Sequence, residues 1–211
     1  MKIIRLEKVD STHTYLKDYI KENGFESSLC VVTNNQTNGI GSRGNSWQGA
    51  KGNLFFSFVL RQSELPCDLP LQSTSIYFSF ILRNILKQFG SNVWLKWPND
   101  FYINDKKIGG TITSMSKDLI FCGIGINIVN IDEKFGKLDI DLNKELLLES
   151  YLNELKKDIS WKQIFSKFRI EFKLSKKFYA TVNNQKVTLQ NAMLNDDGSV
   201  YLNNEKVFSL R

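Results

Sequence analysis

The first part of the chain alternates between strand-like and helix-like apolar patterns. Residues 3–9 read as a short strand, and Leu29–Thr33 as a buried strand because nearly every position is apolar. Between them, residues 10–12 supply several N-cap candidates for a helix that Gly24 can end. The apolar positions of that helix recur at helical spacing at Tyr15, Leu16, Tyr19 and Ile20.

The middle of the chain predicts long helices and further strands. Residues 73–89 carry apolar side chains at helical intervals, and Gly90 can end that helix. Ser160 followed by Gln163 is a capping box, so another helix is predicted to begin there. After a polar, glycine-rich loop at residues 34–51, strands are predicted at residues 53–61, 93–97, 101–103, 107–114 and 119–129.

After Lys177 the pattern changes to short strands separated by hairpin turns. Asp197-Gly198 and Asn203-Asn204 are turn pairs between strands predicted at residues 186–189, 192–194, 200–202 and 207–210. Such a small module buries little surface alone, so we expect it to pack on the main domain. Hairpins mixed with helices favour an α+β fold, divided into residues 1–175 and residues 176–211.

The composition is that of a folded protein and narrows the chemistry. The chain has 211 residues, 42% of them hydrophobic, and 28 Lys and Arg against 22 Asp and Glu give a net charge of +6. No apolar run approaches the roughly 18 residues of a membrane helix and no signal peptide is evident, so we expect a cytoplasmic protein. Three cysteines without metal spacing and one histidine, His13, disfavour a zinc site or a Ser-His-Asp triad.

The glycine-rich loop is the first segment that could carry chemistry. Residues 39–44 fit the spacing G-x-G-x-x-G, but a strand follows instead of a helix, so we reject a dinucleotide-binding turn. A loop with this many glycines exposes backbone N–H groups that can hold an anion. Arg43 would add a cation and Trp47 a flat surface for a base; the alternative is a mobile connecting loop.

The sharpest local feature is the Lys-Trp-Pro-Asn-Asp segment at residues 96–100. Alternation along the strand places Lys96 on the face opposite Leu95, so its side chain is expected to emerge where the strand ends. A strand-end lysine followed by Asn99 and Asp100 could hold an anion and its Mg²⁺. The alternative is a surface lysine beside a turn.

Two further segments place glycines inside apolar strands. They are Lys-Ile-Gly-Gly at residues 107–110 and Gly-Ile-Gly-Ile-Asn at residues 123–127. Glycine in a strand often marks the close approach of a ligand, and crowding between strands is an equal alternative. Asn127 in such a run is a buried polar side chain that needs partners. Residues 11–13 at a helix start can cap the helix or contact a ligand.

Together and in this order, these segments resemble the biotin protein ligases, in a short form without an N-terminal DNA-binding domain. The resemblance runs from about residue 4 to residue 130, and the all-β tail is similar to that family's SH3-like domain. It implies a mixed central β-sheet flanked by helices, with a small SH3-like β-barrel at the C-terminus. It also implies that biotin and ATP form biotinyl-5′-AMP and pyrophosphate, and that a lysine of a biotin carboxyl carrier protein then accepts the biotinyl group.

The resemblance also implies roles for particular residues. Lys96 matches a lysine that touches both the biotin carboxylate and the phosphate, and it is the expected catalytic residue. The residues expected at biotin are Ser11, Thr12, His13, Gln36, Gly39, Ile40, Gly41, Ser42, Lys96, Gly109, Gly110 and Gly123. Those expected at ATP are Arg43, Trp47, Lys96, Asn99 and Asn127, with Asp100 as the expected Mg²⁺ ligand.

The chain departs from the family pattern at the glycine-rich loop. The family usually has Gly-Arg-Gly-Arg where this chain has Ile40 and Ser42, so weaker biotin binding and leakage of biotinyl-AMP are expected unless Arg43 substitutes. The catalytic pattern starts at once, so we expect no operator-specific DNA binding. A homodimer formed through a sheet edge is left open.

Two other functions are compatible with parts of the sequence. A lipoate ligase or octanoyltransferase of similar fold is the nearest, and the Lys-Trp-Pro-Asn-Asp segment favours biotin over it. A basic nucleic-acid-binding module could use the Lys-rich residues 156–186 and their aromatic side chains. Those aromatics follow a helical stripe, which favours a core over a surface for bases.

Overall fold

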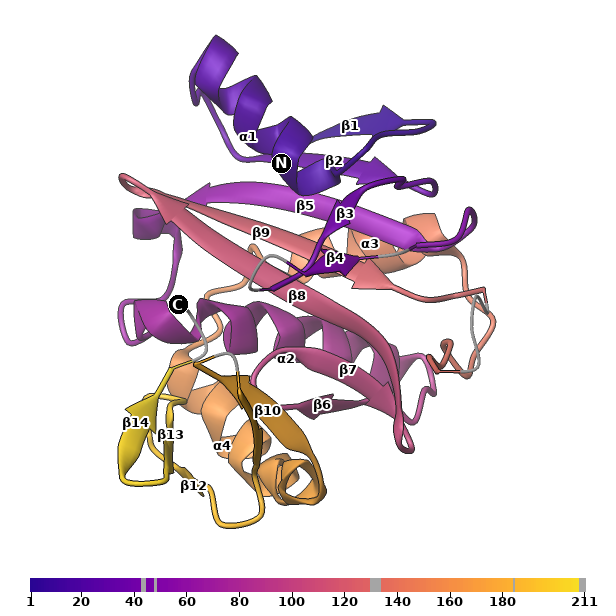
Figure 1. Cartoon of the computed structure of the whole chain (residues 1–211). Helices are drawn as coiled ribbons and strands as arrows, with labels where there is room; N and C mark the ends of the chain where they lie inside the picture. The colour runs from indigo at the N-terminus through magenta and orange to yellow at the C-terminus, as the bar shows by residue number, and fades with distance from the viewer. Residues whose placement is uncertain (43–44, 48, 130–133, 184, 209–211) are drawn as a thin grey trace.

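A mixed β-sheet forms the centre of the protein (Figure 1). The computed structural model describes residues 1–42, 45–47, 49–129, 134–183 and 185–208. The sheet has seven strands in the order β1-β2-β5-β9-β8-β7-β6. Their bounds are Lys2–Leu6 (β1), Leu29–Thr33 (β2), Leu54–Arg61 (β5), Leu119–Ile126 (β9), Lys106–Ser116 (β8), Asp100–Ile103 (β7) and Trp94–Lys96 (β6). β1 and β2 run parallel and every other neighbouring pair is antiparallel, which confirms the expected α+β class.

Helices cover both faces of the sheet because the strands alternate their apolar side chains between the two faces. On one face, Leu16 of the first helix packs with Val59 and Phe121. On the other face, Phe56 and Phe58 of β5 pack in the main core with three further helices. The helices are α1 (Thr12–Asn23), α2 (Thr74–Gln88), α3 (Lys144–Glu154) and α4 (Trp161–Glu171). None of the helices in the described ranges is long and apolar enough to cross a membrane.

Several helix ends lie where the sequence predicts them. The Ser11 side chain caps α1 by accepting from the backbone N–H of Thr14, and Gly24 ends the helix at a φ of 77°. Ser160 and Gln163 form the predicted capping box of α4. No element is predicted at α3, whose run of leucines at residues 146–148 blurs the helical period.

The glycine-rich loop is more ordered than the sequence predicts. β3 (Gly39–Ile40) and β4 (Ser46–Trp47) pair as a short antiparallel hairpin. The hairpin crosses in front of the central strands in Figure 1. Part of the segment that the sequence predicts as an irregular loop is therefore a small hairpin that lies over the sheet.

The C-terminal residues form short antiparallel strands next to α4 (Figure 1). A 3₁₀ helix, η4 (Phe172–Lys177), precedes two small sheets. The strands are β10 (Tyr179–Val182), β11 (Gln185–Thr188), β12 (Met193–Leu194), β13 (Val200–Leu202) and β14 (Glu205–Val207). These strands are compatible with the expected SH3-like domain, and their buried side chains share one core with α4, so the module packs on the main domain as expected. β10 is not predicted by the sequence, and the division at residue 175 stays a prediction.

A buried carboxylate ties α4 to the edge of the sheet. Glu171 accepts a hydrogen bond from the backbone N–H of Leu95 on β6 at 2.6 Å. The other oxygen of Glu171 pairs with Arg83 of α2. Removing Glu171 would leave a buried N–H without an acceptor and a largely buried guanidinium without its partner.

Glu171→Ala is therefore expected to lower the free energy of unfolding by about 3 kcal/mol. Glu171→Gln keeps an acceptor for the Leu95 N–H and should lose clearly less. Urea denaturation of both variants measures this. Equal losses in the two variants would show that the hydrogen bond to Leu95 contributes nothing.

Candidate active site

The start of α1 forms the polar end of a cleft. The side-chain oxygen of Gln36 accepts hydrogen bonds from the backbone N–H of Thr12 at 2.9 Å and from its hydroxyl at 3.2 Å. The Thr12 hydroxyl also lies 2.8 Å from the Ser57 hydroxyl on β5. All three side chains are buried. Polar groups from three distant segments thus converge, an arrangement that suits a ligand with several hydrogen-bonding atoms.

Two glycines keep the floor of the cleft open. A Cβ added at Gly123 would lie 3.1 Å from Ser57 Oγ and 3.2 Å from His13 Nδ1, so a side chain there would fill the space between them. A Cβ added at Gly110 would meet only ordinary contacts, the nearest being Asp100 Oδ1 at 3.4 Å. Both glycines line the cleft, so of the two readings of glycine in these strands, ligand access fits these positions.

At Gly109 the absence of a side chain is explained by crowding between strands and not by ligand access. A Cβ there would lie 2.6 Å from the carbonyl oxygen of Gly125 on β9. The missing side chain therefore allows β8 and β9 to approach each other. Gly125 in turn makes room for the indole of Trp47, whose nitrogen lies 3.0 Å from the position a Cβ would take.

Three charged side chains meet at the middle of the cleft, and we call them the charge cluster: Lys96, Asp100 and Lys107. Asp100 Oδ2 lies 3.2 Å from the Lys96 ammonium, and Asp100 Oδ1 lies 2.6 Å from that of Lys107. Burial alone would raise the pKa of Asp100, but attraction to Lys107 and Lys96 outweighs it and holds that pKa below its usual value. One carboxylate between two ammonium groups leaves a net positive charge for an anion.

Lys96 does not emerge from the strand as the sequence analysis expects. Its side chain is 8% exposed and that of Lys107 is 27% exposed. The Lys96 ammonium lies 5.6 Å from the ring centroid of Tyr102. The alternation is as expected, but Tyr102 and Asp100 of the neighbouring strand cover the lysine.

The cleft consists of two adjoining hollows of about 160 Å³ and 630 Å³. The smaller hollow contains the polar end of the cleft and the glycine floor, and the larger one reaches β10 and contains Lys96. Both hollows share Asp100 and Lys107. The charge cluster therefore lies where the two hollows meet.

Most of the predicted site residues line this cleft. They are Ser11, Thr12, His13, Gln36, Ile40, Gly41, Ser42, Trp47, Lys96, Asn99, Asp100, Gly110 and Gly123. Gly39, Gly109 and Asn127 do not line it, and Arg43 lies outside the described residues.

The two predicted asparagines differ in their surroundings. The buried amide of Asn127 accepts from Asn53 and donates to the carbonyl of Gly136, each at 3.2 Å, so its polar atoms already have protein partners. Asn99 lines both hollows, and its side-chain amide donates to the carbonyl of Thr111. The structure therefore supports Asn99 more directly than Asn127 as a ligand contact.

Sequence reasoning missed Lys107 and Ser57 as site residues. Lys107 begins the Lys-Ile-Gly-Gly segment, in which the two glycines are the more conspicuous signal. Ser57 is a polar residue inside the apolar strand β5, and a polar side chain in such a strand indicates a buried site with hydrogen-bond partners. Neither lies near Lys96 in the sequence, and only the strand pairing brings them to one cleft.

Trp47 forms a flat wall beside the charge cluster. The Lys107 ammonium lies 5.3 Å from the centroid of its ring. Its buried indole nitrogen has no hydrogen-bond partner among the described residues. The expectation that Trp47 lies beside a base is compatible with this placement and stays a prediction.

His13 is buried at the junction of the two hollows. Its Nε2 lies 3.2 Å from the Ser114 hydroxyl, and its Nδ1 has no hydrogen-bond partner in the described part of the chain. Burial, helped by repulsion from Lys17, lowers the pKa of His13 to about 4. The imidazole is therefore neutral at pH 7.

This lowered pKa predicts a loss of stability in acid. Protonation of His13 favours the unfolded chain, so its contribution is complete above about pH 6.5 and is lost as the pH falls to about 4. Between pH 7 and pH 4 the wild type should lose about 2 to 3 kcal/mol more unfolding free energy than His13→Asn. Urea titrations of both proteins at several pH values measure the difference, and identical pH profiles would contradict it.

The charge cluster does not have the ligand set of a resident Mg²⁺. Both oxygens of Asp100 face ammonium groups, and the described residues hold no group of three or more His, Cys, Asp or Glu that could bind a metal. As the side chains stand, the cluster fits an anion and not a divalent cation. The Mg²⁺ site at Asp100 stays a prediction that would require a lysine to move away.

Comparison with known proteins decides the family. The sequence model of the family described as "Biotin/lipoate A/B protein ligase family" matches residues 6–127, which is more than half of the chain. The chain belongs to this family. The resemblance to biotin protein ligases and the ligase catalytic fold are thereby confirmed.

Individual members of the ligase family agree with this assignment. The crystal structure of biotin acetyl coenzyme A carboxylase synthetase from Helicobacter pylori, with bound biotinylated ATP, is 36% identical, covers 98% of this chain and 99% of its own, and gives a TM-score of 0.93. The biotin protein ligase from Aquifex aeolicus in complex with biotin and ATP has a TM-score of 0.75 at 24% identity, covering 100% of this chain and 96% of its own, and shows the fold alone.

The curated members of the family are longer than the match. The bifunctional ligase/repressor BirA of Escherichia coli is 31% identical over 130 residues, which is 58% of this chain and 39% of BirA. The one from Bacillus spizizenii is 28% identical over 138 residues, which is 63% of this chain and 42% of its own length. The chain thus matches about two fifths of these relatives.

Proposed function

We propose that this chain is a biotin protein ligase. It would join biotin to ATP, forming biotinyl-5′-AMP and pyrophosphate, and transfer the biotinyl group to a lysine of a biotin carboxyl carrier protein. The observation that carries this proposal is the charge cluster at the junction of two hollows. One hollow ends in hydrogen-bonding groups and the other is large and open, as two different substrates require.

The smaller hollow fits the biotin part of the reaction. Thr12, Gln36 and Ser57 offer donors and acceptors for a polar ring, and the glycine floor leaves space for an apolar chain. The carboxylate at the end of that chain would then reach Lys107. Lys107 and Lys96 would hold it together with the α-phosphate of ATP.

The charge cluster would lower the barrier of the first step. A carboxylate oxygen attacks the α-phosphorus, forming a new P–O bond while the bond to pyrophosphate breaks. Both reactants are anions, so ammonium groups between them reduce their repulsion and stabilise the charge that develops in the transition state. Asp100 would hold the two lysines in position through its two ion pairs.

The second step would use the open side of the cleft. The unprotonated amine of the carrier lysine attacks the biotinyl carbonyl, an amide forms, AMP leaves and the amine loses a proton. The mixed anhydride hydrolyses in water, so the site must cover it until the carrier arrives. The β3–β4 hairpin, with Ile40 and Ser42, lies over both hollows and suits that task.

The first step can be tested without a carrier. Purified protein is mixed with Mg-ATP and biotin, with lipoate and octanoate in parallel reactions, and products are read by mass spectrometry. Biotinyl-AMP formed from biotin alone is the expected result. An adenylate formed only from lipoate or octanoate would leave the family intact and change the acid, and no adenylate from any of them would refute the proposal.

Loss of the bound intermediate is expected to be fast. Ile40 and Ser42 stand where the family usually has two arginines. Both line the cleft, and Ile40 is 46% exposed there, but neither side chain carries a charge that could hold the adenylate. The half-life of bound biotinyl-AMP should therefore be shorter than in ligases with Gly-Arg-Gly-Arg, and Ile40→Arg with Ser42→Arg should lengthen it. A half-life equal to theirs and unchanged in Arg43→Ala would contradict this.

We further propose that the enzyme acts in the cytoplasm. Cys30 and Cys122 are buried free thiols and Cys67 is an exposed free thiol. Free thiols are typical of a reducing compartment. Biotin, ATP and biotin carboxyl carrier proteins would meet the enzyme there.

A further inference from the structure

The strand that carries Lys96 lies at the edge of the sheet. β6 pairs with β7 on one side, and within the described part of the chain no strand pairs with its other side. Two side chains take the place of the missing strand: Glu171 accepts from the N–H of Leu95 at 2.6 Å, and Ser175 accepts from the N–H of Trp97 at 3.0 Å. Leu95 and Trp97 are two residues apart on an extended segment, and the two acceptors are about one helical turn apart. Because these two spacings are similar, the junction of α4 and η4 can accept from both N–H groups.

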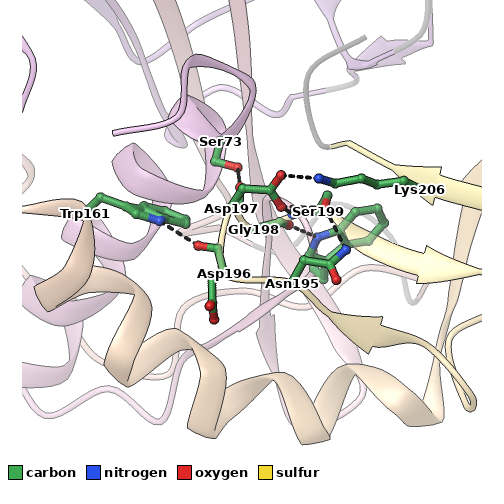
Figure 2. A network of polar contacts seen from close by, with 9 residues as sticks. Ser73, Trp161, Asn195, Asp196, Asp197, Gly198, Ser199 and Lys206 are labelled. Atoms are coloured by element: carbon green, nitrogen blue, oxygen red, sulfur yellow. Dashed lines mark hydrogen bonds and ion pairs between the residues drawn. The ribbon is translucent and has the colours of Figure 1, made fainter. Parts of the chain in front are cut away.

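A turn of the C-terminal module reaches the same segment. The carbonyl oxygen of Gly198 accepts a hydrogen bond from the indole N–H of Trp97 at 2.9 Å. The preceding carbonyls also accept: Asp197 from the Ser73 hydroxyl at the start of α2, and Asp196 from the indole N–H of Trp161 at 2.9 Å. Figure 2 shows this turn between Ser73 and Trp161. Three successive carbonyls therefore bind three different parts of the main domain.

The turn itself is held in one conformation. The Asp197 carboxylate accepts from the backbone N–H of Ser199 at 3.1 Å and from its hydroxyl at 2.6 Å, and it pairs with Lys206 at 2.7 Å (Figure 2). Gly198 has a φ of 80°, and a Cβ there would lie 2.5 Å from Ser73 Oγ. Glycine is required both by the backbone and by the close approach to α2.

We propose that the turn at residues 195–199, with Ser175, positions Lys96 and Asp100 for catalysis by holding Trp97. Trp97 is fully buried and lines neither hollow, so it acts through its neighbours in the chain and is a positioning residue. The residues that hold it lie beyond residue 127, outside the segment that matches the family description. As a role in catalysis, this inference rests on the proposed ligase function.

The argument is one of rigidity at the reacting centre. Lys96 is followed directly by Trp97, and Asp100 lies three residues further on, at the start of β7. Trp97 is fixed at its backbone N–H and at its indole N–H, by two elements that come from different parts of the chain. A shift of about 1 Å in a reacting group can cost about 100-fold in rate, so loosening Trp97 should be felt in turnover.

The turn provides its own matched control. Trp97→Phe and Trp161→Phe each remove one indole N–H that donates at 2.9 Å to neighbouring carbonyls of the same turn. Both should lower the melting temperature, since each leaves a carbonyl without its partner. Only Trp97→Phe should lower kcat for adenylate formation, by about tenfold or more, with KM for biotin unchanged because the polar end of the cleft is untouched. Trp161→Phe should stay within about twofold of the wild-type kcat.

Hydrogen exchange tests the same inference without turnover. Mass spectrometry of peptides covering residues 94–103 should show faster amide exchange in Trp97→Phe and wild-type exchange in Trp161→Phe. Ser175→Ala, a smaller change, should also speed exchange there and lower kcat, and it keeps the test available if Trp97→Phe does not fold. Equal effects of the two tryptophan variants on kcat and exchange, or none in Trp97→Phe and Ser175→Ala, would overturn the proposal. A wild type that makes no adenylate would refute the ligase function, and the exchange data would still decide whether the turn holds residues 96–100.

Discussion

Replacing Lys107 by alanine is expected to slow adenylate formation by about 100- to 1,000-fold, the usual cost of removing one preorganised group that stabilises transition-state charge. Lys107 lies where the two hollows meet, 2.6 Å from Asp100, and its partly exposed side chain can turn toward a substrate. The variant should also lose some stability, because little packing is lost but the buried Asp100 carboxylate keeps only Lys96 as a counter-charge. Pyrophosphate release, measured with saturating biotin and Mg-ATP, gives the rate.

Lys96→Ala is expected to be as slow but less stable. Lys96 is buried beneath Tyr102 and is one of two cations that compensate Asp100, so its removal should cost about 2 kcal/mol of unfolding free energy. Lys96→Met fills most of the lost volume and separates packing from charge. Lys106→Ala is the control for net charge, because Lys106 adjoins Lys107 on β8 and lines neither hollow. Near-normal rates in Lys96→Met and Lys107→Ala together would remove the charge cluster from the mechanism.

Gly110→Val is expected to weaken biotin binding by about 100-fold without unfolding the protein. A Cβ at this position has only ordinary contacts, so the strand tolerates it, but the side chain would extend into the smaller hollow beside Asp100. Isothermal titration with biotin and a thermal melt give the two numbers. Unchanged affinity would mean that biotin lies elsewhere.

Gly109→Ala, one residue away, should have the opposite pair of effects: lower stability and nearly unchanged biotin binding. Its Cβ would lie 2.6 Å from the carbonyl oxygen of Gly125 and 2.6 Å from Ile126 Cδ1, so β8 and β9 would have to separate. We expect a loss of about 3 kcal/mol in stability. The remaining folded protein should bind biotin nearly normally, since Gly109 does not line the cleft. The pair therefore separates a glycine that leaves room for substrate from one that leaves room for a neighbouring strand.

Local signals in the sequence predict local structure well. The capping box at Ser160 and the turn at residues 203–204 depend on neighbours in the chain and are found as predicted, and of the cap candidates at residues 10–12 the structure selects Ser11. α3 is missed because its leucines run consecutively instead of at helical intervals. β10 is missed because its alternation is short and its partner is another exposed strand. The hairpin β3–β4 is missed because glycine-rich sequence looks irregular whatever it packs against.

The candidate site depends on which strands pair with each other, and this pairing could not be predicted from the sequence. Lys96 and Asp100 are found because they adjoin in one motif, but Lys107 joins them only because β7 lies between β6 and β8. Gly109 and Gly110 look alike in sequence, and opposite faces of one strand give them different roles. Whether Lys96 is accessible or covered depends on Tyr102 across the hairpin. Composition and periodicity carry none of these facts.

The position of β9 in the sheet has a consequence for how the protein is made. β9 lies between β5 and β8, yet it follows both in the chain. On a ribosome, β5, with the sequence Leu-Phe-Phe-Ser-Phe-Val-Leu-Arg, therefore emerges well before the strand that covers one of its edges. Until residue 126 has emerged, two strands of the sheet's centre present unpaired backbone groups, the kind of edge through which chains aggregate. A chaperone that binds this apolar strand until β9 emerges would therefore be expected to raise the yield of folded protein.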